Sequence, residues 1–121
     1  MPIMRTFLTT ILFILLCVPL YAAGTLRIYF IDTEGGQSTL FVSPSGQTML
    51  VDTGNLDPNG RDPRRIAAVA GQAGVNRIDY LLITHYRSDH VGGVPELSKL
   101  LPISNFIDHG PEVEKERIPA F

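Results

Sequence analysis

The segment at residues 84–93, which reads THYRSDHVGG, carries most of the side chains in this sequence that could do chemistry. Two histidines and one aspartate, His85, Asp89 and His90, fall close together within it. Imidazole and carboxylate groups suit zinc and other transition metals, and such groups on one loop converge on a cation where the backbone turns sharply. The pattern favours a metal site. The alternative is that Asp89 caps the next helix and both histidines are incidental polar residues at a strand end.

The elements on either side of this segment must position those side chains. Residues 78–84 hold the apolar residues Tyr80, Leu81, Leu82 and Ile83 in succession, which predicts a central strand that is buried on both faces of a sheet. Residues 91–101 follow helical spacing up to Pro102, and Gly92 and Gly93 would let that helix pack closely. Open α/β sheets bind their ligands at the carboxyl ends of strands, so the position also favours a functional site.

The remaining elements predict a mixed α/β fold. A surface loop over residues 53–61 precedes a helix that we expect to have Asp62 as its N-cap, Pro63 as its first residue and Gly74 as its stop. From Pro111 onward the chain is polar, which indicates a solvated segment or one that packs only against further chain. Strands are expected at residues 26–32, 38–43, 47–52 and 103–107.

These motifs together resemble the metallo-β-lactamase superfamily, whose signature is His-x-His-x-Asp-His followed by Gly-Gly after an apolar strand. Residues 51–54, VDTG, resemble the strand end before the first helix of that fold. Gly36 and Gln37 resemble the opening hairpin of secreted members related to the hydrolase domain of DNA-uptake competence channels. The resemblance covers residues 26–111 and implies the first half of an αββα sandwich. It further implies a zinc hydrolase that cleaves an ester, an amide or a phosphodiester. The substrate would be a small molecule or another compound with such a bond.

The resemblance also assigns roles to individual residues. His85 is expected to be a ligand of a first metal ion, and Asp89 and His90 are expected to be ligands of a second, with Asp89 as the catalytic residue. Asp52 and Thr84 are expected to hold the ligand loop from behind, as outer carboxylates do around metal sites. The alternative for Asp52 is a turn residue that caps the two residues after it.

Arg87 departs from the signature, because it stands where the family has its second histidine. A guanidinium stays charged, does not ligate a cation and repels one, so at most one zinc ion is expected, bound around Asp89 and His90. Arg87 is either a lesion or a contact for an anionic substrate group. The family's later ligands come from its C-terminal half. His109 is the one further histidine in this sequence, and because Gly110 and Pro111 follow it, we expect an exposed turn residue rather than a ligand.

Three functional hypotheses follow. The first is a metal-dependent hydrolase whose activity is impaired by truncation and by Arg87. The second is a non-catalytic binding or assembly module on the same scaffold, and the third is an inert gene fragment. A half-sandwich would leave one sheet face bare, so self-association through that face is also expected.

Composition limits the classes of partner and compartment. The 121 residues include 10 Lys and Arg against 12 Asp and Glu, so no stable nucleic-acid binding is expected, and the single cysteine excludes an internal disulfide framework. Residues 1–23 resemble a signal peptide, with Arg5 before an apolar run and small residues at Ala22 and Ala23. We therefore predict export to the periplasm or medium. Membrane contact is expected only through that segment, and residues 24–121 are expected to form the domain.

Overall fold

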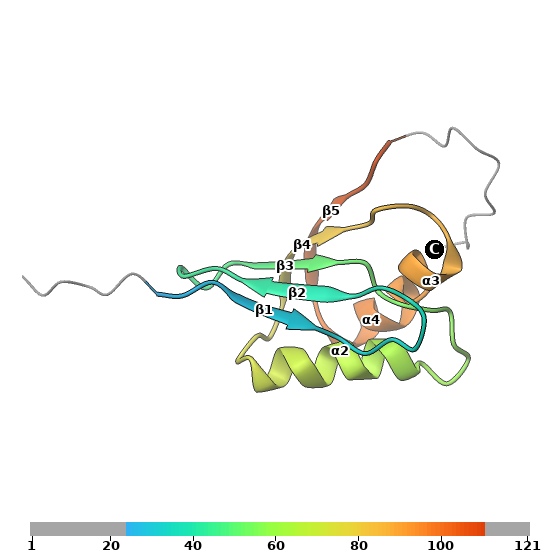
Figure 1. Cartoon of the computed structure of the whole chain (residues 1–121), viewed down its shortest axis with the longest axis horizontal. Coiled ribbons are helices and arrows are strands. Elements are labelled where there is room, and N and C mark those ends of the chain that lie inside the picture. The colour runs from blue at the N-terminus through green and yellow to red at the C-terminus, as the bar shows by residue number, and fades with distance from the viewer. Residues whose placement is uncertain (1–23, 111–121) are drawn as a thin grey trace, which may run out of the picture.

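The computed structural model describes residues 24–110, which form a single five-stranded sheet with helices packed against it (Figure 1). The signal peptide predicted over residues 1–23 and the solvated segment predicted from Pro111 lie outside the described residues. No helix within residues 24–110 combines the length and the apolar character that crossing a membrane requires.

The sheet has its strands in sequential order, β1-β2-β3-β4-β5, and it changes from antiparallel to parallel pairing at β3. β1 pairs with β2 and β2 with β3 in antiparallel fashion, whereas β3–β4 and β4–β5 are parallel. Every strand predicted from the sequence is confirmed, and each lies within its expected range. Their bounds are Arg27–Phe30 for β1, Thr39–Val42 for β2, Thr48–Val51 for β3, Ile78–Leu82 for β4 and Ile103–Ile107 for β5.

The first helix within residues 24–110, α2 (Arg61–Gln72), begins earlier than the sequence predicts. Its N-cap is Gly60 in the left-handed conformation, so the expected N-cap role of Asp62 and first-residue role of Pro63 are wrong. Glycine adopts this backbone readily, and the amide of Arg61 donates to Asp57 Oδ2 at 3.3 Å, which lets the helix start before Asp62.

The buried Asp62 carboxylate instead fixes the loop before the helix. It accepts hydrogen bonds from Asn55 N at 2.8 Å and from Arg61 Nε at 2.7 Å. Burial alone would raise the pKa of Asp62, but the bonds from Arg61 and Asn55 outweigh it and lower that pKa below its ordinary value.

The helical segment predicted over residues 91–101 is two helices, α3 (Ser88–Val91) and α4 (Val94–Leu100), separated by Gly92 and Gly93. A Cβ at Gly92 would clash with the backbone nitrogen of Leu56, and one at Gly93 with the carbonyl oxygen of Thr53. The prediction that these glycines permit close packing is confirmed.

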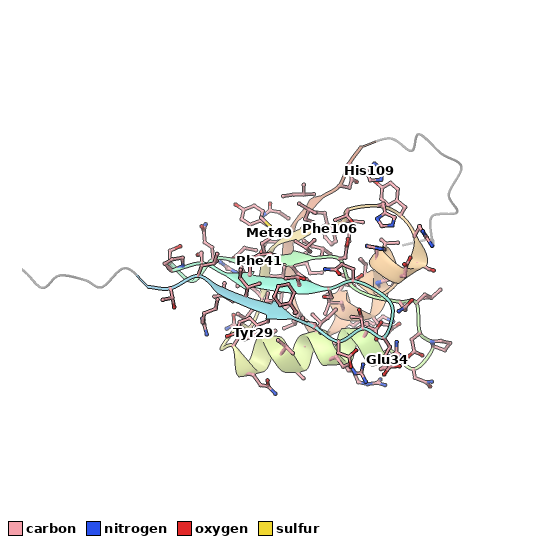
Figure 2. All side chains as sticks on the ribbon, in the orientation of Figure 1. Tyr29, Glu34, Phe41, Met49, Phe106 and His109 are labelled. Carbon is pink, nitrogen blue, oxygen red and sulfur yellow. The ribbon has the colours of Figure 1, made fainter. Side chains whose placement is uncertain are left out.

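The core lies between the sheet and the helices, which cover one face of it (Figure 1). The opposite face carries an apolar row in which Ile28, Phe41, Met49 and Tyr80 are paired in register (Phe41 and Met49 are labelled in Figure 2). Fully buried side chains on the covered side include Leu40, Leu50, Ile66, Leu81 and Leu97.

β4 is therefore not buried on both faces, and that prediction is wrong. Leu81 is fully buried, but Tyr80 is 37% exposed, because no helix within residues 24–110 covers its side of the sheet. The expected central position is confirmed, because β4 lies between β3 and β5 and is not an edge strand.

Backbone hydrogen bonds join the segment that follows β3 to the end of β4 and to α3. The pairing continues beyond the strands, where Asp52 N donates to Leu82 O at 2.9 Å. The carbonyl oxygens of α3 then accept from other segments, Ser88 O from Leu56 N at 3.2 Å and His90 O from Thr53 N at 2.6 Å. This short helix is thus held in place by the segment that follows β3.

Candidate metal centre

Three side chains that could hold a metal ion come together at the carboxyl end of β4. One ligand atom from each of His85, Asp89 and His90 lies within 4.8 Å of the others, and all three residues are partly buried. His85 lies in the loop that follows β4, and the other two lie on α3. The sequence expectation that these residues gather at one end of a strand agrees with this placement, while their role as ligands stays a prediction.

Asp52 orients one of the two imidazoles. Its carboxylate is completely buried, and Oδ2 lies 2.7 Å from His90 Nδ1. A carboxylate only accepts hydrogen bonds, so Nδ1 carries the proton, and in the neutral imidazole Nε2 is then the nitrogen with a lone pair for a metal. His90 Nε2 faces Asp89 Oδ2 at 3.6 Å, so the available nitrogen points toward the other candidate ligand.

Thr84 links the same carboxylate to the second imidazole. Its amide donates to Asp52 Oδ1 at 2.8 Å and its hydroxyl donates to Asp52 Oδ2 at 2.7 Å. The hydroxyl oxygen can then accept from His85 Nδ1 at 3.1 Å, which leaves His85 Nε2 free to bind a metal. The rings of His85 and His90 lie 3.7 Å apart between centroids, and a ligand atom of each lies within 4.8 Å of the other.

The geometry contradicts two of the alternatives left open by the sequence. Asp52 does not cap the residues after it, because Thr53 N donates to His90 O and Gly54 N donates to Gln37 O. Asp89 caps neither neighbouring helix, because it lies within α3, whose N-cap is Arg87, and the N-cap of α4 is Gly93.

Arg87 stands at the rim of the cluster. Its Nε lies 3.7 Å from Asp89 Oδ1, which is an ion pair beyond hydrogen-bond length, and the side chain is 64% exposed. Its backbone is extended, with φ −74° and ψ 148°, and it starts α3. Arg87 therefore contributes charge to the site without being part of the ligand set.

His109 lies apart from the cluster, at the end of β5, and is exposed (Figure 2). Its ring contacts Tyr86 with centroids 4.7 Å apart. The amide of Gly110, which donates to Asp108 at 2.8 Å, and the Tyr86 hydroxyl hold the pKa of the Asp108 carboxyl below its usual value. Sequence reasoning missed this link between the ligand loop and β5, and no motif marks Tyr86 or Asp108.

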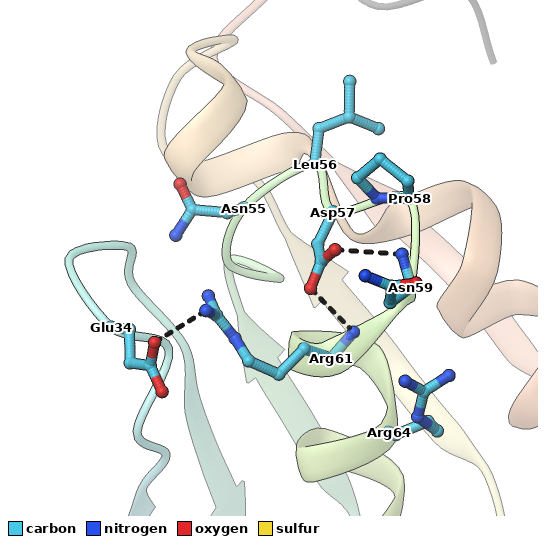
Figure 3. Close-up of a pocket in the computed structure, with 8 residues that line it drawn as sticks. All are labelled: Glu34, Asn55, Leu56, Asp57, Pro58, Asn59, Arg61 and Arg64. Carbon is cyan, nitrogen blue, oxygen red and sulfur yellow. Dashed lines mark hydrogen bonds and ion pairs between the residues drawn. The ribbon is translucent and has the colours of Figure 1, made fainter.

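A separate hollow of about 760 Å³ lies beside the loop that precedes α2 (Figure 3). Its charged groups are largely satisfied: Arg61 pairs with Glu34 at 2.7 Å, and Asp57 accepts from the amides of Asn59 and Arg61. None of the three candidate metal ligands lines it. The residues that do are Glu34, Asn55, Leu56, Asp57, Pro58, Asn59, Arg61 and Arg64.

Comparisons with known proteins agree on one family. The sequence profile described as the Metallo-beta-lactamase superfamily matches residues 32–119. The chain is 32% identical over 81 residues to the "Atrochrysone carboxyl ACP thioesterase dmxR1" of Cryptosporiopsis sp. (strain 8999), covering 65% of this chain and 24% of that protein. The chain thus spans about a quarter of the length of the curated relatives it matches.

Solved structures give the same result for the fold. A subclass B3 metallo-beta-lactamase, MEM-A1 from a soil metagenome library, aligns with a TM-score of 0.52 and 26% identity over 64% of this chain and 28% of its own. A Cronobacter sakazakii metallo-beta-lactamase described by its HARLDQ motif aligns with a TM-score of 0.51 and 21% identity, over 69% of this chain and 32% of its own. The described residues correspond to an N-terminal part of that fold.

Proposed function

Because this chain belongs to the metallo-beta-lactamase superfamily, we propose that it is the metal-binding, N-terminal part of an exported zinc-dependent hydrolase. The observation that carries the proposal is the cluster of His85, Asp89 and His90, in which buried Asp52 fixes the orientation of one imidazole. Superfamily members depend on metals, and this cluster is the one group within residues 24–110 that could hold an ion.

The donor set fits a single zinc ion. Catalytic zinc sites have three protein ligands and one open position. Nε2 of both histidines and Oδ2 of Asp89 would supply those three ligands, since Nδ1 of each ring faces Asp52 or Thr84. A second ion beside it is disfavoured by the fixed positive charge of Arg87, 3.7 Å from Asp89.

The residues of this chain prepare that site for hydrolysis. When bound, zinc would polarise a substrate carbonyl and lower the pKa of water. Asp52 keeps the proton of His90 on Nδ1, and Thr84 extends the same hydrogen-bonded chain to His85. Asp89 has Oδ2 beside His90 Nε2 at 3.6 Å and Oδ1 beside Arg87 Nε at 3.7 Å.

For the bond that is cleaved, we favour an ester or thioester. The support is the 32% identity to a protein described as a thioesterase, and a phosphodiester is the alternative. The formal charge of −2 argues against stable nucleic-acid binding, and the signal-like residues 1–23 support export to the periplasm or medium.

Arginine at position 87 is compatible with this fold. The HARLDQ motif of the Cronobacter sakazakii protein and residues 85–90 here, HYRSDH, share histidine, arginine and aspartate at the same three places. Arg87 is also the observation that favours the second candidate function, a binding module that keeps the scaffold without metal chemistry.

Zinc content and affinity of the purified chain test the proposal, by competition against a chelating dye. We expect about one equivalent of zinc, lost in Asp89→Ala and retained in the control Asp32→Ala, whose carboxylate is 76% exposed and pairs with Arg65. Zinc binding that survives Asp89→Ala would place the ion elsewhere. No zinc binding would leave the non-metal binding module as the better proposal.

A further inference from the structure

We propose that Arg87 selects substrates that carry an anionic oxygen group, a carboxylate or a phosphate, beside the bond that is cleaved. The inference rests on the proposed zinc-dependent function, because it places the anion next to the ion that His85, Asp89 and His90 would hold. It assigns a specificity-determining role to the residue that replaces the second histidine of the family signature.

The two oxygens of Asp89 face in different directions. Oδ2 lies 3.6 Å from His90 Nε2, within the ligand cluster, and Oδ1 lies 3.7 Å from Arg87 Nε. One carboxylate therefore connects the candidate metal position with the guanidinium. A substrate held at the metal on this side would meet Arg87 within a few ångströms of the ion.

The guanidinium is available for a ligand. The side chain is 64% exposed, and its one contact with a charged group within residues 24–110 is the 3.7 Å ion pair, which is too long for a hydrogen bond. The arginines of α2 that support the fold differ from it. Arg61 hydrogen-bonds both Glu34 and Asp62, and Arg65 bonds both Asp32 and Glu34.

The backbone of Arg87 is nevertheless fixed. Its carbonyl oxygen accepts from His90 N at 2.9 Å and from Val91 N at 3.0 Å, at the start of α3. Because its backbone is fixed and its planar guanidinium is exposed, Arg87 suits bidentate recognition of a carboxylate or phosphate. A lysine ammonium cannot reproduce that geometry.

Charge balance points to the same kind of ligand. The carboxylates in and behind the cluster, Asp89 and Asp52, would balance the charge of a divalent ion. Arg87 would then share its ion-pair partner, Asp89 at 3.7 Å, with that ion. An anionic group on the substrate would give Arg87 a further counter-charge. Its attraction to the guanidinium would offset more of the cost of removing the anion from water than a neutral residue could.

The experiment titrates inorganic phosphate and, separately, acetate into the zinc-loaded full chain by calorimetry. Arg87→Gln should weaken anion binding by about tenfold or more, and Arg87→Lys by a smaller factor. Arg64→Gln is the matched control, because Arg64 is an exposed arginine that lines the separate hollow. It should leave the affinity unchanged, and all variants should keep the zinc stoichiometry of the wild type.

The outcomes separate this inference from the proposed function. Tighter binding of phosphate would identify a phosphorylated substrate, and tighter binding of acetate a carboxylate. If the zinc-loaded wild type binds neither anion, or Arg87→Gln binds them as the wild type does, the role of Arg87 is overturned while the zinc site stands. If no variant retains zinc, both proposals are overturned.

Discussion

Asp52 Oδ2 lies 2.7 Å from His90 Nδ1, although the two residues are 38 positions apart in the sequence. Asp52 directly follows β3 and has a positive φ of 59°, and His90 lies on α3. The buried carboxylate therefore orients a candidate metal ligand before any ion is bound. This is the arrangement expected of a preformed metal site rather than of an incidental polar cluster.

Removing the charge of Asp52 should weaken zinc binding. Asp52→Asn keeps the shape of the side chain but no longer requires the proton of His90 to stay on Nδ1, so we expect zinc affinity to fall by about 10- to 100-fold. Dye competition measures the change. Asn59→Asp, which alters an exposed amide of the loop before α2, is a control that should keep the affinity. Unchanged affinity in Asp52→Asn would mean that this bond serves the fold alone.

The buried Asp62 carboxylate should make stability depend on acid pH. Its pKa is lowered in the folded chain, so its contribution is complete above the ordinary value of 3.8 and is lost as the pH falls through the lower, folded value. Asp62→Asn should cost about 2 to 3 kcal/mol near pH 7, measured by urea unfolding. The gap between the two proteins should narrow below about pH 4. A gap that is independent of pH would contradict the assignment.

Gly93 should tolerate no side chain. Its φ of −81° is ordinary, but a Cβ would clash with the carbonyl oxygen of Thr53, so Gly93→Ala should destabilise the fold by about 1 to 3 kcal/mol. Gly71→Ala is the matched control. Gly71 lies within α2 with open space around it, and the change should stabilise by about 0.5 to 1 kcal/mol. Thermal unfolding of both variants tests the contrast.

The exposed sheet face should drive self-association. Phe30, on β1, is 85% exposed, and Ile28, on the same face of that strand, is 45% exposed. We expect the chain to sediment as a larger species that dissociates in Phe30→Glu. Leu56→Glu, at a 60% exposed position near α3, should leave the association unchanged. A wild-type chain that sediments as a monomer at all concentrations would contradict this prediction.

The local part of the site was predictable from the sequence, because its members are close in the chain. His85, Asp89 and His90 lie on one short segment bounded by an apolar strand and a glycine pair, so their proximity follows from local turns alone. The bond from Asp52 spans 38 positions, and only the resemblance to a family indicated it. Periodicity carries no information on contacts of that range.

Other features depend on partners that sequence patterns do not reveal. Asp62 has the residue type of an N-cap, yet Gly60 starts the helix, because the carboxylate is used by Asn55 and Arg61. The apolar run around Tyr80 indicates burial on both faces, but it cannot show which elements do the covering. In residues 24–110 the helices cover one face only.

Replacing Arg87 with histidine should strengthen zinc binding. The change removes a cation 3.7 Å from Asp89 and adds a neutral imidazole two positions after His85. Arg87→Gln removes the same charge without adding a ligand, so it separates the two effects. We expect zinc affinity to rise about tenfold or more in Arg87→His, and by less in Arg87→Gln. Equal gains would show that charge alone limits binding. If neither variant binds zinc more tightly than the wild type, the cluster lacks further ligands that one added histidine cannot replace.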